Sequence, residues 1–135
     1  MSSPPKDPIE AAKRIIMLRE AATSFRSFIK AAFPQFVLAP FHEELIEILN
    51  ALENGTLGKR AALITMPPRH GKSTIANVAF PAYYMMRKAT RRILAVSYGA
   101  DLAANFGRQV RDLTQEQILA QAFPNFQLNP TFLLS

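Results

Sequence analysis

The chain has 135 residues, and its 16 lysines and arginines against 10 aspartates and glutamates give a formal net charge of +6 at pH 7. Hydrophobic residues make up 49% of the sequence, which excludes a wholly disordered chain, and the lack of cysteine excludes disulfides and thiolate metal sites. We expect a soluble chain without a membrane partner, because no apolar run fits a signal peptide or a span, and the basic excess suits a polyanion.

The first 35 residues are expected to form a short tail followed by helix. Residues 1–6 contain serine and proline without periodicity, so we expect a disordered tail there. Asp7 can cap a helix that has Pro8 at its first position. Apolar residues at helical spacing extend this helix to about Ala32, and residues 7–35 are expected to form an N-terminal helical segment.

A second helix is expected soon afterwards. A short extended stretch precedes Pro40, and Leu45, Ile48, Leu49 and Leu52 follow at helical spacing, which predicts a helix over 41–52. Gly55 is placed to end it as a C-cap glycine.

Two short apolar runs, 61–66 and 92–98, have the length and composition of buried strands in a parallel sheet. Between them a helix should begin at about Gly71 and bend or restart near Pro81. The pattern of two helices followed by strand, helix, strand and helix predicts an α/β fold with a parallel sheet.

The last predicted elements are helical. Asp101 opens a helix that should reach about Leu113. Thr114 and Gln117 have the spacing of a capping box for a further short helix that ends before Pro124.

The segment with a chemical signature is Thr65-Met-Pro-Pro-Arg-His-Gly-Lys-Ser-Thr74, between a predicted strand and a predicted helix. Binding a polyphosphate requires inward backbone N–H groups, a helix N-terminus, a mobile cation and a hydroxyl for Mg²⁺. Gly71, Lys72 and Ser73 can supply these groups. Lys72 would reach the β and γ phosphates, Ser73 would ligate Mg²⁺, and Thr74 would lie near the α phosphate.

One position departs from the general phosphate-loop pattern. Met66 stands where that pattern has its leading glycine, although Pro67 and Pro68 can set a rigid turn in another way. The alternative is a Gly-Lys-Ser turn that only starts a helix, and the flanking strand and helix favour the phosphate site.

Several segments together resemble the large terminase subunit of tailed bacteriophages, over about Phe36 to Phe126. They are Pro40-Phe-His-Glu-Glu-Leu-Ile46, Pro67-Pro-Arg-His-Gly-Lys-Ser73, Arg92-Ile-Leu-Ala-Val-Ser-Tyr98 and Ala100-Asp-Leu-Ala-Ala-Asn-Phe-Gly-Arg-Gln-Val-Arg111. In that family the leading glycine is commonly lost, so Met66 agrees with the resemblance.

The resemblance implies a P-loop ATPase domain of the additional-strand class that uses ATP and Mg²⁺ to drive double-stranded DNA into a capsid. It further implies a homo-oligomeric ring, a portal, a small terminase subunit and a location in the cytoplasm of the infected host. Residues 36–135 would then form a partial ATPase domain.

The resemblance also implies roles for single residues around the loop. Phe41 would stack on adenine, and His42 would make a polar contact to the nucleotide. The alternatives are that Phe41 packs into the core and that His42 is an exposed first-turn residue. Arg69 would stabilise charge on the transferred phosphoryl group as a catalytic residue beside Lys72, or it pairs with a carboxylate or DNA. Pro68 and His70 would complete the loop around the nucleotide, His70 by a phosphate contact or by filling space.

The second strand and its helix carry weaker candidates. Ser97 and Tyr98 end the predicted strand, where Ser97 would polarise a water, contact DNA or cap the next helix. Asp101 fits a helix cap better than a metal ligand. Six basic residues would face DNA or a ring neighbour, or form a solvated face: Arg87, Lys88, Arg91, Arg92, Arg108 and Arg111.

The acidic group needed for hydrolysis has no counterpart in this sequence. ATP hydrolysis usually requires an apolar strand that ends in a carboxylate pair. After Ser73 the only acidic residues are Asp101, Asp112 and Glu116, and none follows an apolar strand. We therefore expect a fragment that binds nucleotide at most. The alternatives are a non-catalytic remnant or interaction module, and a helicase-like motor fragment.

Overall fold

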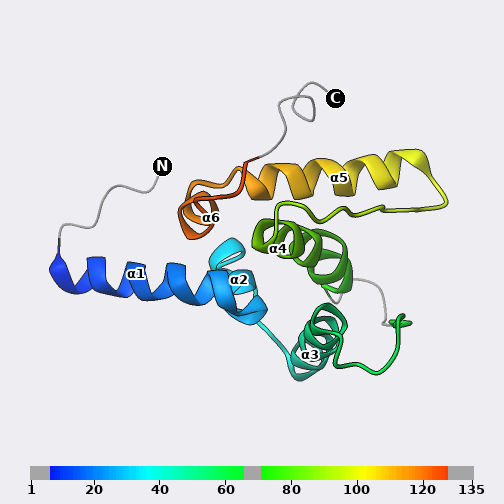
Figure 1. Ribbon diagram of the computed structural model, residues 1–135, viewed down its shortest axis with the longest axis horizontal. Helices are drawn as coiled ribbons and strands as arrows, with labels where there is room; N and C mark the ends of the chain where they lie inside the picture. Colours follow the sequence, from blue (N-terminus) through cyan, green and yellow to red (C-terminus); the bar gives the residue numbers. More distant parts are fainter. Residues whose placement is uncertain (1–6, 66–70, 128–135) are drawn as a thin grey trace.

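The computed structural model describes residues 7–65 and 71–127, which are helical and contain no strand (Figure 1). The predicted tail at residues 1–6 lies outside this part of the chain. The elements in order are α1 (Pro8–Thr23), α2 (Phe25–Ala32), α3 (Pro40–Asn54), the π-helical stretch η1 (Thr74–Ala79), α4 (Phe80–Arg87), α5 (Ala100–Thr114) and α6 (Gln117–Ala122).

The predicted α/β fold with a parallel P-loop sheet is wrong for the described residues. Residues 61–65 and 92–98 form no strand, and most of their side chains are exposed: Leu63 keeps 93% and Leu94 87% of its accessible surface. A buried strand needs neighbouring strands for its backbone groups and a packed layer over its faces. No strand elsewhere in 7–65 or 71–127 pairs with these segments, so their apolar composition did not lead to burial.

The predicted helix from Pro8 to Ala32 is instead two helices that meet at Ser24. Ser24 has extended backbone angles (φ −130°, ψ 123°), and its hydroxyl accepts from the Ser27 N–H at 3.3 Å to cap α2. The break turns Phe25 and Phe28 into the core. The predicted cap at the start of α1 is confirmed, since Asp7 accepts from the backbone N–H of Ile9 at 3.0 Å.

The predicted irregularity near Pro81 is confirmed as a π-helical stretch. The helix continues from Lys72 to Arg87, and the backbone N–H of Phe80 donates to the Ile75 carbonyl, five residues back. Pro81 has no N–H and its ring clashes with a normal α-helical turn before it, so the wider turns of η1 accommodate it.

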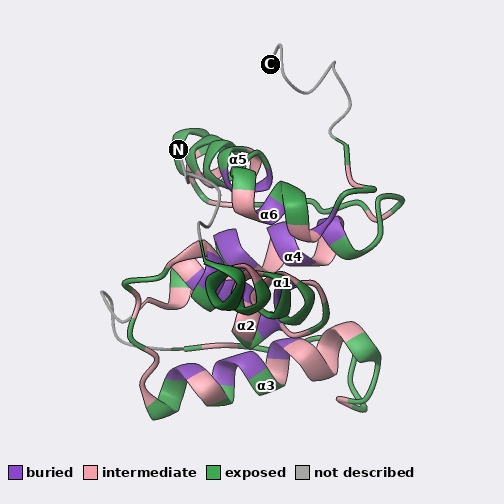
Figure 2. Cartoon of the chain, turned by 90° about the vertical axis from the view of Figure 1, so that its left-hand side faces the viewer, coloured by how far each residue is buried: buried purple, intermediate pink, exposed green. Residues whose placement is uncertain are grey.

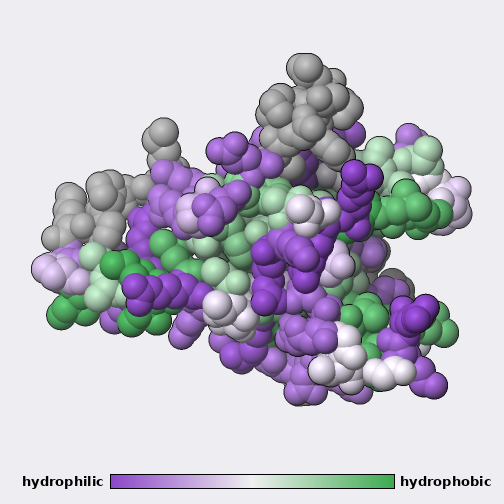
Figure 3. Space-filling view, viewed as in Figure 1, coloured by the Kyte–Doolittle hydropathy of each residue, from purple (hydrophilic) through white to green (hydrophobic). Residues whose placement is uncertain are grey.

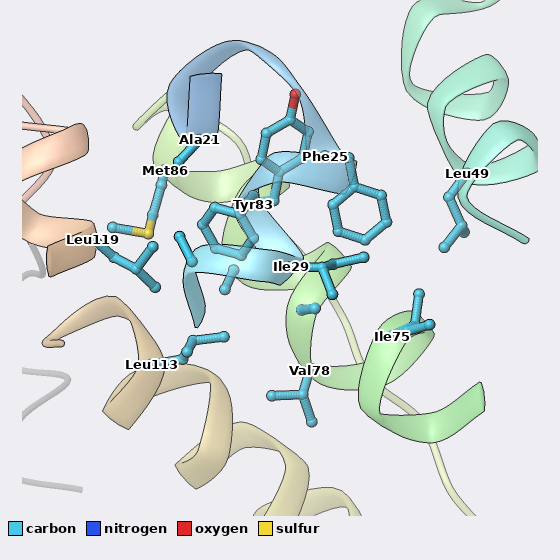
Figure 4. Close-up of a cluster of buried hydrophobic side chains, with 14 of the residues drawn as sticks. Ala21, Phe25, Ile29, Leu49, Ile75, Val78, Tyr83, Met86, Leu113 and Leu119 are labelled. Atoms are coloured by element: carbon cyan, nitrogen blue, oxygen red, sulfur yellow. The ribbon is translucent and has the colours of Figure 1, made fainter. Parts of the chain in front are cut away.

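The core is built from aromatic side chains of α2 and α4, with aliphatic residues from the other helices around them (Figure 4). The Tyr83 ring stacks on Phe25 at a centroid distance of 5.1 Å and lies 5.3 Å from Phe28. Phe28 also meets Phe123, just after α6, at 6.0 Å. Each such pair contributes about 0.5–1.5 kcal/mol beyond the burial of its area. Segments far apart in the sequence are thereby joined in one core.

Helix α3 packs its apolar face onto this core and ends as predicted. Leu45, Ile46 and Leu49 are buried, and Figure 2 shows buried residues recurring along α3 between exposed ones. Gly55 ends the helix with a left-handed φ of 73°, which confirms the C-cap. An exposed ion pair between Arg26 and Glu43, at 2.7 Å, links α3 to α2.

The two C-terminal helices are confirmed, but their predicted caps are wrong. Gly99 is the N-cap of α5, and Asp101 lies in the first turn, where its charge suits the helix dipole. Helix α6 has Glu116 at its N-cap. The Thr114 hydroxyl instead donates to the Arg111 carbonyl at 2.7 Å, within α5.

The surface is mixed in character. Hydrophobic side chains appear among polar ones in Figure 3. The most exposed large hydrophobic side chains include Leu63, Leu94, Val96 and Tyr98, which belong to the apolar segments 61–65 and 92–98. Among the described helices none combines the length and the apolar character needed to cross a membrane.

Candidate functional site

The Gly71–Ser73 turn begins a helix and requires glycine at its first position. Gly71 has a φ of 78°, in the left-handed region that other residues adopt at a cost. Lys72 and Ser73 are already helical, and the Gly71 carbonyl accepts from the Ile75 N–H at 3.0 Å. The N–H groups of this first turn are therefore at the positive end of the helix dipole, which favours an anion.

Lys72 and Ser73 lie on the wall of a cavity of about 650 Å³. Asn77, one helical turn after Ser73, lines the same wall, and the extended segment 92–97 forms part of the lining. The other lining residues come from α3, η1, α4 and α5: Leu52, Glu53, Ala76, Phe80, Pro81, Tyr84, Leu102, Ala103 and Phe106. The lining thus combines the cationic side chains of Lys72 and Arg92 and the hydroxyls of Ser73 and Ser97 with mostly apolar neighbours.

The remaining loop residues divide into two groups. Met66, Pro68, Arg69 and His70 lie outside the described residues. The catalytic role predicted for Arg69 therefore stays a prediction. Thr74 is half-buried at the start of η1 and is not part of the cavity lining.

The first turn of α3 lies against the Gly71 turn. A Cβ atom built on Gly71 would be 3.1 Å from Nε2 of His42. His42 is only 5% exposed, so the alternative of an exposed first-turn residue is wrong. Its Nδ1 accepts from the Ala39 N–H at 2.9 Å, which places the proton of the neutral ring on Nε2. The Phe41 ring lies 4.1 Å from the His42 ring and is itself exposed.

Glu53 is a member of the cavity wall that sequence reasoning missed. Its side chain is 2% exposed, and it pairs with Arg87 and, at 3.3 Å, with Arg91. Arg91 also donates to the Tyr84 carbonyl at 3.1 Å, and its guanidinium lies 4.1 Å from the centre of the Tyr84 ring. These contacts join the end of α3 to the end of α4. No local pattern signals them, because the partners are more than 30 residues apart.

The contacts of Glu53 change the interpretation of the basic cluster. Arg87 and Arg91 are occupied by a carboxylate and by aromatic rings, whereas Lys88 is exposed and Arg92 lines the cavity. Arg108 is exposed, and Arg111 lies 3.8 Å from Asp112. The six predicted residues therefore do not act as one uniform basic surface.

The candidates at the end of the second predicted strand are separated by their exposure. Ser97 lines the cavity, and its hydroxyl accepts from the Gly99 N–H at 3.5 Å, next to the start of α5. Tyr98 is fully exposed.

No group of three or more histidine, aspartate or glutamate side chains that could hold a metal ion occurs within 7–65 and 71–127. The predicted Mg²⁺ ligand, Ser73, is exposed at the cavity wall, so its hydroxyl is accessible.

Comparison of the chain with protein-family models, with curated proteins and with solved structures gave no match.

Proposed function

We propose that this chain is the ATP-binding N-terminal part of a phage terminase large subunit, which powers the packaging of double-stranded DNA. The observation that carries the proposal is the left-handed Gly71 followed by Lys72 and Ser73 on the wall of one cavity. A phosphate chain at this point would meet helix N–H groups, an ammonium and a hydroxyl together.

The residues divide the work of binding. The Lys72 ammonium neutralises the β and γ phosphates, and the Ser73 hydroxyl is the protein ligand for Mg²⁺. When bound, Mg²⁺ neutralises charge between the two phosphates. By the same proposal Pro68, Arg69 and His70, which lie outside the described residues, would contribute to nucleotide binding, with Arg69 stabilising charge on the γ phosphate. Phe41 and His42 belong to the first turn of α3, and His42 faces Gly71.

Binding without appreciable turnover is the activity that this chain's own residues support. Hydrolysis needs a carboxylate that orients the attacking water, and none of the acidic residues after Ser73 directly follows either apolar run. In the packaging motor the partners would be double-stranded DNA, the portal, the small terminase subunit and further copies in a ring, in the cytoplasm of the infected bacterium.

The test is ATP binding in the presence of Mg²⁺ by wild type and Lys72→Ala. Loss of a charge-assisted contact worth about 1.5–3 kcal/mol should weaken binding by roughly tenfold to a hundredfold. Lys88→Ala is the matched control, because it removes the same charge from an exposed position outside the cavity. Equal affinities of wild type and Lys72→Ala would remove the phosphate site, and steady turnover by the chain alone would contradict the assignment of binding only.

A further inference from the structure

Phe36 lies between α2 and α3, in a segment to which the sequence analysis gave no role. Its backbone N–H donates to the Phe33 carbonyl at 3.0 Å, so a tight turn after α2 fixes its position. Its half-buried ring meets the His42 ring edge-on at a centroid distance of 5.0 Å. Phe36 is thus held both by its own turn and by the first turn of α3.

The same ring covers the Cα of Gly71. A Cβ atom on Gly71 would be 2.4 Å from Cζ and 2.9 Å from Cε2 of Phe36, closer than real Cβ contacts come. Since Gly71 also has a left-handed φ, two independent constraints require glycine here: its backbone angle and the ring beside it.

His42 contacts both Phe36 and the Gly71 turn. Its Nδ1 is engaged by the Ala39 N–H, its ring packs against Phe36, and its Nε2 lies on the side facing Gly71. The turn that begins the η1 helix is therefore packed against two rings that belong to the segment 36–42, about thirty residues earlier in the chain.

We propose that Phe36 is a positioning residue for the Gly71–Ser73 turn. Its ring limits the backbone of Gly71 to the left-handed conformation, and this fixes the direction in which the N–H groups of Lys72 and Ser73 point. Phe36 does not contact the phosphates; it acts through the turn. The consequence for nucleotide affinity rests on the proposed function, whereas the ordering of the turn does not.

Amide hydrogen exchange tests the ordering directly. The N–H of Ile75 donates to the Gly71 carbonyl, so it reports opening of this turn. Phe36→Leu removes the ring but keeps an apolar side chain, and exchange at Ile75 should become at least about fivefold faster while the amides of α2 are unchanged. Phe33→Leu is the matched control, because Phe33 is half-buried three residues away and is not among the atoms nearest to Gly71.

Unchanged exchange at Ile75 in Phe36→Leu would overturn the proposal, as would equal acceleration by Phe33→Leu. A second measurement then separates the two proposals. If ATP binding depends on Lys72, Phe36→Leu should weaken it by about tenfold and Phe33→Leu should not. ATP binding that ignores Lys72→Ala would refute the proposed function, and the exchange result would still decide the role of Phe36.

Discussion

Replacing Gly71 by alanine should destabilise the protein for two separable reasons. Alanine must adopt a φ of 78°, which an L residue avoids, and its methyl group must displace the Phe36 ring from a distance of 2.4 Å. Gly58 provides the matched control. It has nearly the same φ, 74°, but nothing lies within 4 Å of the Cβ position.

The two variants differ in what the new methyl group meets: the Phe36 ring, with His42 Nε2 beside it, at Gly71, and nothing within 4 Å at Gly58. Left-handed strain is worth roughly 1–2 kcal/mol, and forcing a packed side chain aside adds roughly 1–3 kcal/mol. Gly58→Ala should therefore lower the free energy of unfolding by about 1–2 kcal/mol. Gly71→Ala should lower it by about 2–5 kcal/mol, the sum of both effects.

Urea denaturation of wild type and both variants, extrapolated linearly to water, measures this difference. The m-values should agree, because neither change alters the surface that unfolding exposes. If Gly71→Ala and Gly58→Ala lower the free energy of unfolding equally, the Phe36 ring does not constrain Gly71 and the reasoning is refuted.

Two further predictions concern α3 and α4. Glu53→Ala leaves Arg87 and Arg91 without their carboxylate and should lower the free energy of unfolding by about 2–4 kcal/mol. The control, Glu44→Ala, is at an exposed position and should change this free energy by less than about 0.5 kcal/mol. Similar values for the two variants would contradict the buried pairing. Burial raises the pKa of the Tyr83 hydroxyl, against a smaller lowering by Arg91. The folded state therefore keeps this proton at pH values where the unfolded chain releases it, so the free energy of unfolding should fall as pH rises above about 10. Urea denaturation at a series of pH values should show a less steep fall in Tyr83→Phe than in wild type. The same dependence on pH in both proteins would exclude this contribution.

Local signals predicted most helix ends well. Asp7 and Gly55 act through groups within a few residues of themselves, so their roles could be inferred from sequence. Pro81 likewise predicted an interruption of the regular α-helix. At the candidate site, a helix that begins at the Gly-Lys-Ser turn was expected from the residue types there. The contact of this turn with α3 was not expected, because it joins residues about thirty positions apart.

Other features depend on partners that the sequence does not identify. Ser24 divides one periodic stretch into two helices because the core aromatic residues of α2 must turn inward. Segments 61–65 and 92–97 have the composition of strands, but a strand is stabilised by neighbours, and the described chain supplies none. Composition alone therefore predicted the wrong fold class.

The sequence by itself determined the helical segments, their glycine and proline boundaries and the turn at Gly71–Ser73, because these depend on interactions over a few residues. The tertiary structure alone decided that Phe36 covers Gly71, that Glu53 joins α3 to α4, and that both apolar segments stay exposed. Each of these depends on groups far apart in the chain, and packing of the whole core brings them together or leaves them apart.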